Sequence, residues 1–163
     1  MSTVVITGGS RGIGAAAVSL FAGLGHRVYF LYEKEHTAAA QVAQATGATA
    51  ICCDVADGAA VQAAFAQIPA VDILICNAGI SLVGLMSQMP EADWDRIFAV
   101  NVKGIYHCVN AAMPSFLRAH SGCIITVSSM WGQVGASCED PNCAGSPACA
   151  GLSSAFAAFS CCS

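Results

Sequence analysis

Short apolar segments recur along the chain, and helix-like segments separate them. Five of these segments are rich in β-branched residues and predict strands over residues 4–7, 28–32, 48–53, 73–76 and 124–128. A chain that alternates strand and helix joins its strands by right-handed crossovers, which predicts an α/β fold with a doubly wound parallel sheet. Ligands bind outside the carboxyl ends of the strands in such sheets, so functional residues are expected directly after the strands.

The segments between the predicted strands carry the start and stop signals of helices. Helices are expected over residues 13–24, 38–45 and 57–67. Gly25 is expected to end the first, and Asp57 to cap the start of the third. A longer helix should begin at Pro90, and Pro114 should kink or end it. Its expected buried face comprises Trp94, Ile97, Phe98, Ile105 and Val109.

Composition limits the class of protein. The 163 residues suit one domain, and 10% charged residues is low beside the roughly 25% usual in soluble domains. The net charge of −4 and the six scattered Lys and Arg argue against nucleic acid as a partner. No apolar run reaches the roughly 18 residues of a membrane span, and no basic leader precedes the first strand. We therefore expect a cytoplasmic protein without membrane association.

A glycine-rich segment, Thr7-Gly-Gly-Ser-Arg-Gly-Ile-Gly14, joins the first predicted strand to the first predicted helix. Glycines permit a tight turn and a close backbone approach to a pyrophosphate, and a helix N-terminus offers N–H groups and a favourable dipole. The spacing is Gly-x3-Gly-x-Gly. The alternative is an ordinary strand–helix turn, although the strand before it and the helix after it favour a phosphate-binding loop.

Further landmarks follow the loop in a specific order. They are Asp54-Val55, Asn77-Ala78-Gly79, Asn101-Val102-Lys103-Gly104 and Ser128-Ser129. Together with the loop, this set resembles the short-chain dehydrogenase/reductase family over residues 1 to about 139. The resemblance is strongest to 3-oxoacyl-acyl-carrier-protein reductases, and residues 127–139 also resemble a reductase branch that acts on a modification of elongation factor P. It implies a Rossmann-like sheet, incomplete at about five strands, and a homo-oligomer in the intact family.

The resemblance also implies roles for individual residues. Those that would hold the phosphates and adenosine end of a nicotinamide cofactor are Gly8, Ser10, Arg11, Gly12, Ile13 and Gly14. Asp54 and Val55 would contact the adenine. The residues that would support the adenosine ribose and the central sheet are Asn77, Ala78 and Gly79. Asn101 would organise a water in a proton relay, and Ser129 would hydrogen-bond the carbonyl of a small-molecule or carrier-bound ketone.

Each polar residue in this set also has a plain structural interpretation. Asp54 would only cap a turn, and Asn77 would be a turn residue that tolerates left-handed dihedral angles. Asn101 lies four residues from both Ile97 and Ile105, so it would sit on an apolar face as a structural tie. Ser129 would be a loop serine.

The residues after the second strand bear on which nicotinamide cofactor is used. An NAD site usually has an acid there for the ribose 2′-hydroxyl, and this chain has Tyr32 followed by Glu33 and Lys34. Arg11 and Lys34 would instead bind a 2′-phosphate, which suits fixed cations. NADP(H) is therefore predicted over NAD(H).

Two residues of the family's chemistry are missing from the sequence. The family pattern predicts a Tyr proton donor and, four residues later, a Lys, where this chain has Asn142 and Ser146. General acid catalysis is typically worth about 10²–10⁴-fold, so ketone reduction should be very slow. The resemblance then implies that the chain is an NADPH-dependent carbonyl reductase by descent. The alternatives are a non-catalytic NADP-binding remnant or a broken-gene product.

The composition changes near residue 140. No charged residue follows Asp140, and five of the ten Cys lie in the last 26 residues. We therefore expect a dinucleotide-binding domain over residues 1–139 and an irregular Cys-, Ala- and Ser-rich tail over 140–163. The Cys spacing in the tail matches no compact zinc motif, so no metal site is predicted.

Overall fold

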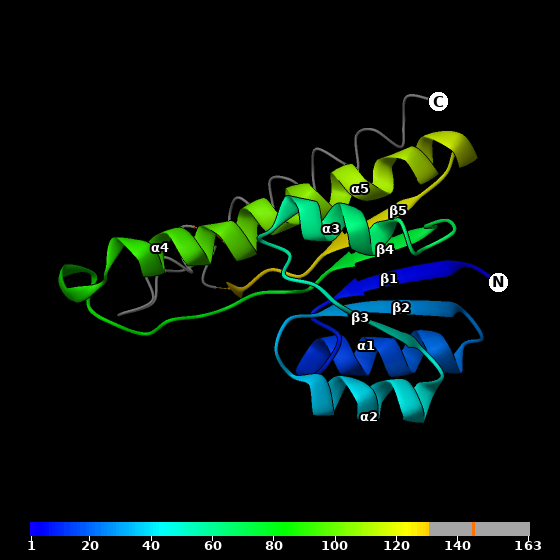
Figure 1. Ribbon diagram of the computed structural model, residues 1–163, viewed down its shortest axis with the longest axis horizontal. Helices are drawn as coiled ribbons and strands as arrows, with labels where there is room; N and C mark the ends of the chain where they lie inside the picture. Colours follow the sequence, from blue (N-terminus) through cyan, green and yellow to red (C-terminus); the bar gives the residue numbers. More distant parts are fainter. Residues whose placement is uncertain (131–144, 146–163) are drawn as a thin grey trace.

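In the computed structural model, five parallel strands form one twisted sheet with helices on both faces (Figure 1). The structure describes residues 1–130 and 145. The strands are β1 (Thr3–Thr7), β2 (Arg27–Tyr32), β3 (Thr49–Cys52), β4 (Ile73–Cys76) and β5 (Cys123–Thr126). Their order across the sheet is β3-β2-β1-β4-β5. The chain thus crosses over β1 once, and the predicted doubly wound parallel sheet is confirmed.

The central strand β1 shows how the apolar runs build two cores. Successive side chains of a strand point to opposite faces, so a strand buried on both faces is apolar throughout. Val4 and Ile6 enter one buried cluster with Val18 of the first helix, while Val5 enters the other with Ile105. Val4, Val5 and Ile6 are all fully buried.

Within the described residues, two helices cover each face of the sheet. α1 (Gly12–Gly23) and α2 (His36–Thr46) lie on one face, and α3 (Gly58–Phe65) and α5 (Gly104–Ala119) lie on the other (Figure 1). Gly25, at φ 80°, closes α1: its N–H donates to the Ala22 carbonyl, and the next N–H donates to Phe21. The Asp57 carboxylate accepts from the N–H groups of Ala59 and Ala60 at the start of α3, as predicted.

The predicted long helix after Pro90 is interrupted by a π-helical turn, and Pro114 does not end it. It consists of α4 (Glu91–Phe98), a π-helical turn η2 (Ala99–Lys103) and α5, preceded by a short 3-10 helix η1 (Met86–Gln88). Pro114 lies within α5, which continues to Ala119. Ala112 and Phe116 on either side of it are buried against the sheet, so packing holds the helix together across the proline.

Strand β5 is an edge strand within the described residues. Its Ile124 packs into the core beneath α5, whereas Ile125 is 42% exposed. Ile125 pairs with Ile75 and so shares the sheet face that carries α1 and α2. The predicted tail over 140–163 and the predicted boundary at 139 lie outside the described residues, Gly145 excepted.

Two glycines of α1 give a matched test of this packing. A Cβ added at Gly14 would collide with the carbonyl of Gly8, while one added at Gly23 would meet nothing within 4 Å. Gly14→Ala is therefore expected to lower the free energy of unfolding by roughly 1–3 kcal/mol. Gly23→Ala should raise it by about 0.5–1 kcal/mol, because alanine favours helix. Urea unfolding of both variants measures this, and equal effects would contradict it.

Candidate functional site

The glycine-rich loop turns sharply between β1 and α1. Gly8 and Gly12 have φ of 68° and 55°, values that glycine adopts without strain. Gly9 packs against the Phe30 ring, and its N–H donates to the Leu31 carbonyl at 3.1 Å. Residue Arg11 precedes α1, and its side chain makes no capping hydrogen bond. The loop therefore presents a glycine cradle and the positive end of a twelve-residue helix at the carboxyl edge of the sheet.

Thr7 and Asn77 join the loop to the strand on its other side. The Thr7 hydroxyl, on a residue only 2% exposed, accepts from the N–H groups of Asn77 and Ala78, both at 2.9 Å. The side-chain nitrogen Nδ2 of Asn77 donates to the carbonyls of Thr7 at 3.0 Å and Gly8 at 3.2 Å. These four bonds fix the end of β1 against the end of β4. Asn77 thus supports the sheet, and its contact with a ribose remains a prediction.

Asn101 lies in the π-helical turn η2, and its side chain holds one backbone segment. Its Oδ1 accepts from the Ile80 N–H and its Nδ2 donates to the Ile80 carbonyl, each at 2.9 Å. A π-helical turn inserts one extra residue and is frequent at functional sites. The side-chain geometry is that of a structural tie for the segment after Gly79. The role of Asn101 in a water relay remains a prediction.

Asp54 and Val55 follow β3 and differ in their surroundings. Asp54 Oδ1 accepts from the Ala56 N–H at 2.9 Å, so this carboxylate does cap a turn. Val55 is buried, and its side chain packs against Gly104. Its carbonyl lies 2.9 Å from His107 Nδ1, and a carbonyl only accepts, so Nδ1 carries the hydrogen. The contact of Val55 with adenine remains a prediction.

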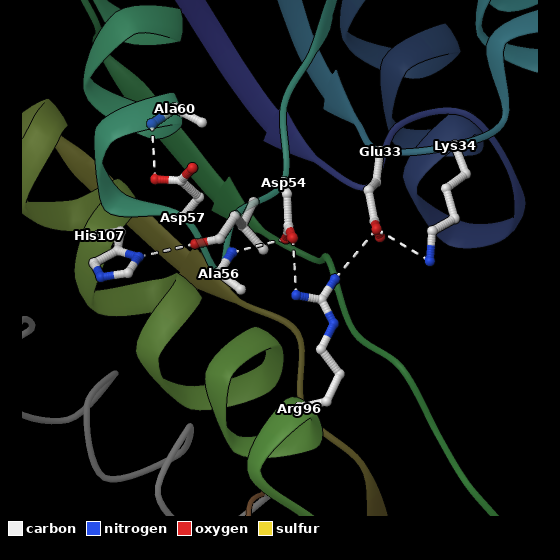
Figure 2. Close-up of polar contacts among 9 residues, drawn as sticks. Glu33, Lys34, Asp54, Ala56, Asp57, Ala60, Arg96 and His107 are labelled. Carbon is white, nitrogen blue, oxygen red and sulfur yellow. Dashed lines mark hydrogen bonds and ion pairs between the residues drawn. The ribbon is translucent and has the colours of Figure 1, made fainter. Parts of the chain in front are cut away.

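A chain of four alternating charges crosses the carboxyl ends of β2 and β3 (Figure 2). Arg96 Nη1 lies 2.8 Å from Asp54 Oδ2, and Arg96 Nη2 lies 3.2 Å from Glu33 Oε1. Lys34 Nζ lies 3.1 Å from the same Glu33 oxygen. Partial burial acts to raise the pKa of Asp54, but the Arg96 guanidinium and the Ala56 N–H outweigh it and hold that pKa below its usual value.

Sequence reasoning missed Arg96. It lies in the last turn of α4, outside every landmark of the family pattern, and 42 residues from Asp54. Only the folded chain brings it to the ends of β2 and β3. Lys34, predicted to bind a phosphate, is 78% exposed and paired with Glu33.

The remaining predicted residues lie along the same edge of the sheet. Ser10 and Arg11 belong to the loop, Gly12 and Ile13 begin α1, and Ser129 is exposed after β5. The Val127 N–H donates to the Cys76 carbonyl at 2.9 Å, which keeps the ends of β5 and β4 level. Ser129 and Asn77 therefore follow neighbouring strands at one edge. Asn142 and Ser146 lie outside the described residues.

Comparison with known proteins identifies the family. A family model described as short chain dehydrogenase matches residues 2–158. The chain therefore belongs to the short chain dehydrogenases, a family of oxidoreductases. Within the described residues, no helix is long and apolar enough to cross a membrane.

Individual relatives agree with this assignment. A 3-oxoacyl-[acyl-carrier-protein] reductase, FabG, of Staphylococcus aureus is 35% identical over 142 residues, covering 82% of this chain and 58% of the relative. The cyclic-di-GMP-binding biofilm dispersal mediator protein of Escherichia coli is 46% identical over 105 residues, covering 64% of this chain and 44% of the relative. The chain spans about half the length of these curated relatives.

Solved structures are similar as well. A crystal structure of BdcA in complex with NADPH matches with a TM-score of 0.84 and 36% identity, covering 93% of this chain and 62% of that one. A short-chain dehydrogenase from Streptomyces avermitilis matches with a TM-score of 0.90 and 26% identity, covering 98% and 60%.

Replacing Thr7 tests the junction between β1 and β4. Thr7→Val keeps the shape of the side chain but leaves two N–H groups without their acceptor, so it should lower the free energy of unfolding by roughly 1–3 kcal/mol. Thr7→Ser keeps the hydroxyl and loses one methyl, which costs about 0.8 kcal/mol. Urea unfolding compares the two, and a larger loss for Thr7→Ser would refute the role given to the hydroxyl.

The lowered pKa of Asp54 predicts an acid dependence of stability. Because its folded pKa lies below the unfolded value of about 3.9, its stabilisation is present above that value and lost as pH falls through the folded pKa. Asp54→Asn should therefore lose less stability than the wild type between neutral pH and about pH 3. Asp95→Asn, which removes an exposed carboxylate of α4, should decline like the wild type. Parallel declines of all three proteins in urea would contradict this.

Proposed function

We propose that this chain binds NADPH, with the pyrophosphate over the glycine-rich loop and the N-terminus of α1. The observation that carries the proposal is the loop cradle, in which Gly8 and Gly14 leave no room for a Cβ and the Thr7–Asn77 bonds fix its base. The donor set of backbone N–H groups and Arg11 fits a phosphate. The similarity to BdcA, which is described in complex with NADPH, supports it.

The charged residues favour NADPH over NADH. Arg11 is exposed beside the loop, and Lys34 follows β2, so both cations lie at the adenosine end that we propose. Glu33, the acid that would suit a ribose 2′-hydroxyl, is paired with Lys34 and Arg96. Its charge is thereby compensated, which supports a site for the 2′-phosphate.

We infer carbonyl reduction as the ancestral chemistry, in which the bound nicotinamide supplies the hydride. Ser129 would hydrogen-bond the ketone oxygen after β5, and Asn101 would keep the segment after β4 in place for a water relay. Asn142 cannot act as a proton donor as tyrosine does, and Ser146 has no positive charge. This chain would therefore retain binding and lose about 10²–10⁴-fold in rate.

The substrate class is proposed from the relatives. The similarity to FabG supports a 3-oxoacyl group carried on a protein, and a ketone on an elongation factor P modification is the alternative. A homo-oligomer in the cytoplasm is the arrangement we propose for the intact protein. The missing Tyr and Lys favour a second candidate, a cofactor-binding protein without turnover.

Calorimetric titration of the full chain with NADPH tests the proposal. We expect saturable binding, and at least tenfold weaker binding for Arg11→Gln, since a charged hydrogen bond to phosphate contributes about 1.5–3 kcal/mol. Arg27→Gln removes an exposed cation at the start of β2, the opposite edge of the sheet, and should bind normally. Absence of NADPH binding by the wild type would refute the proposal.

Assays of turnover then separate the two candidates. With an acetoacetyl thioester, NADPH oxidation should be at the limit of detection if the chain only binds the cofactor. Turnover at a rate typical of enzymes, about 1 s⁻¹ or more, would show that Asn142 and Ser146 do not prevent catalysis.

A further inference from the structure

The guanidinium of Arg96 holds two carboxylates from two different strand ends. One terminal nitrogen bonds to Asp54 after β3, and the other lies against Glu33 after β2 (Figure 2). All three side chains are about one-third exposed, so they meet at the rim of the sheet and not in open solvent. Arginine suits this position because its planar fork pairs with two acceptors at once.

The position of Arg96 is set by packing. Its neighbour Ile97 is fully buried, which anchors the end of α4 against the domain. Glu33 is also held from its backbone, because the Cys52 thiol donates to its carbonyl at 3.5 Å. The guanidinium therefore meets carboxylates whose backbones are already placed.

Glu33 lies where a dinucleotide's adenosine ribose is expected, and Asp54, which is expected beside the adenine, pairs with the same guanidinium. In dinucleotide-binding sheets an acid near the end of the second strand binds the ribose 2′-hydroxyl, whereas a nearby cation accommodates a 2′-phosphate. Glu33 directly follows β2, and Asp54 follows the adjacent β3. Left uncompensated, two carboxylates at this point would repel a phosphate monoester, which carries about −1.5 to −2 charges near pH 7.

We propose that Arg96 is a specificity-determining residue, which neutralises Glu33 and Asp54 and thereby lets the site accept the 2′-phosphate of NADPH. The inference rests on the proposed cofactor site and adds a residue of α4 to it. Lys34 cannot replace Arg96, because it is 78% exposed and its ion pair among the described residues is with Glu33. Without Arg96 the cluster changes from net zero to net −1, and Asp54 loses its cation.

The test compares NADPH with NADH, since the two differ only in the 2′-phosphate. Dissociation constants are measured by calorimetry on the full chain at one fixed salt concentration. Arg96→Gln should weaken NADPH binding about tenfold or more and leave NADH binding within about threefold, which changes the preference between the cofactors. Arg96→Lys keeps the charge but not the fork, so the change should be smaller. Arg118→Gln removes an exposed arginine from the last turn of α5 and should change neither constant.

A double variant separates specificity from simple support of the fold. If Glu33 repels the phosphate once Arg96 is gone, Arg96→Gln combined with Glu33→Gln should regain most of the lost NADPH affinity. A structural tie would give the opposite result, because removing a second partner of the tie cannot restore it. Melting temperatures of all variants, measured without cofactor, report any loss of folding independently.

The measured affinities decide the inference. A selective loss of NADPH affinity that Glu33→Gln reverses would support it. Equal weakening of both cofactors, or a selective loss that Glu33→Gln does not reverse, would overturn it. An unchanged preference in Arg96→Gln would overturn it while leaving the proposed function intact. Failure of the wild type to bind either cofactor would overturn the proposed function, and this inference with it.

Discussion

The hydrogen bonds that join Thr7 to Asn77 and Ala78 decide the arrangement of the candidate site. They join the ends of β1 and β4, where the chain reverses its direction of travel across the sheet. A crevice opens at such a point in any doubly wound sheet, and ligands bind there. Here one buried hydroxyl and one side-chain amide join the ends of the two strands, so the loop beside them depends on four hydrogen bonds.

The meeting of Glu33, Asp54 and Arg96 depends on the strand order of the sheet. The strand order places β2 and β3 side by side, so two acids that follow them come close together. A cation is then needed between them, and α4 supplies it. The two ion pairs of Arg96 thus connect α4, which follows β4, to the ends of β2 and β3 in the other half of the sheet. Stability and ligand preference thus share the same three side chains.

Much of this arrangement could be predicted from the sequence, and the part that could not has a physical cause. β-Branched runs and the glycine loop predicted the five strands and the first turn, because both signals are local. Pro114 does not end α5, because burial of Ala112 and Phe116 outweighs the cost of a proline. Arg96 and the bonds of Asn101 to Ile80 were not predictable, since each depends on which distant backbone lies opposite.

The π-helical turn between α4 and α5 has a consequence for the evolution of this edge. An α-helix rotates about 100° per residue, so one extra residue sets the two helices at different angles about a shared axis. α5 can then direct Ile105 and Val109 into the core while α4 directs Arg96 toward the strand ends. Deleting one residue within Ala99–Lys103 would remove the extra residue of the π-helical turn and rotate Arg96 away from both acids. Insertions or deletions in this turn would thus rotate α4 about its axis relative to α5. They would change which side chain of α4 faces the strand ends and leave the core unaltered.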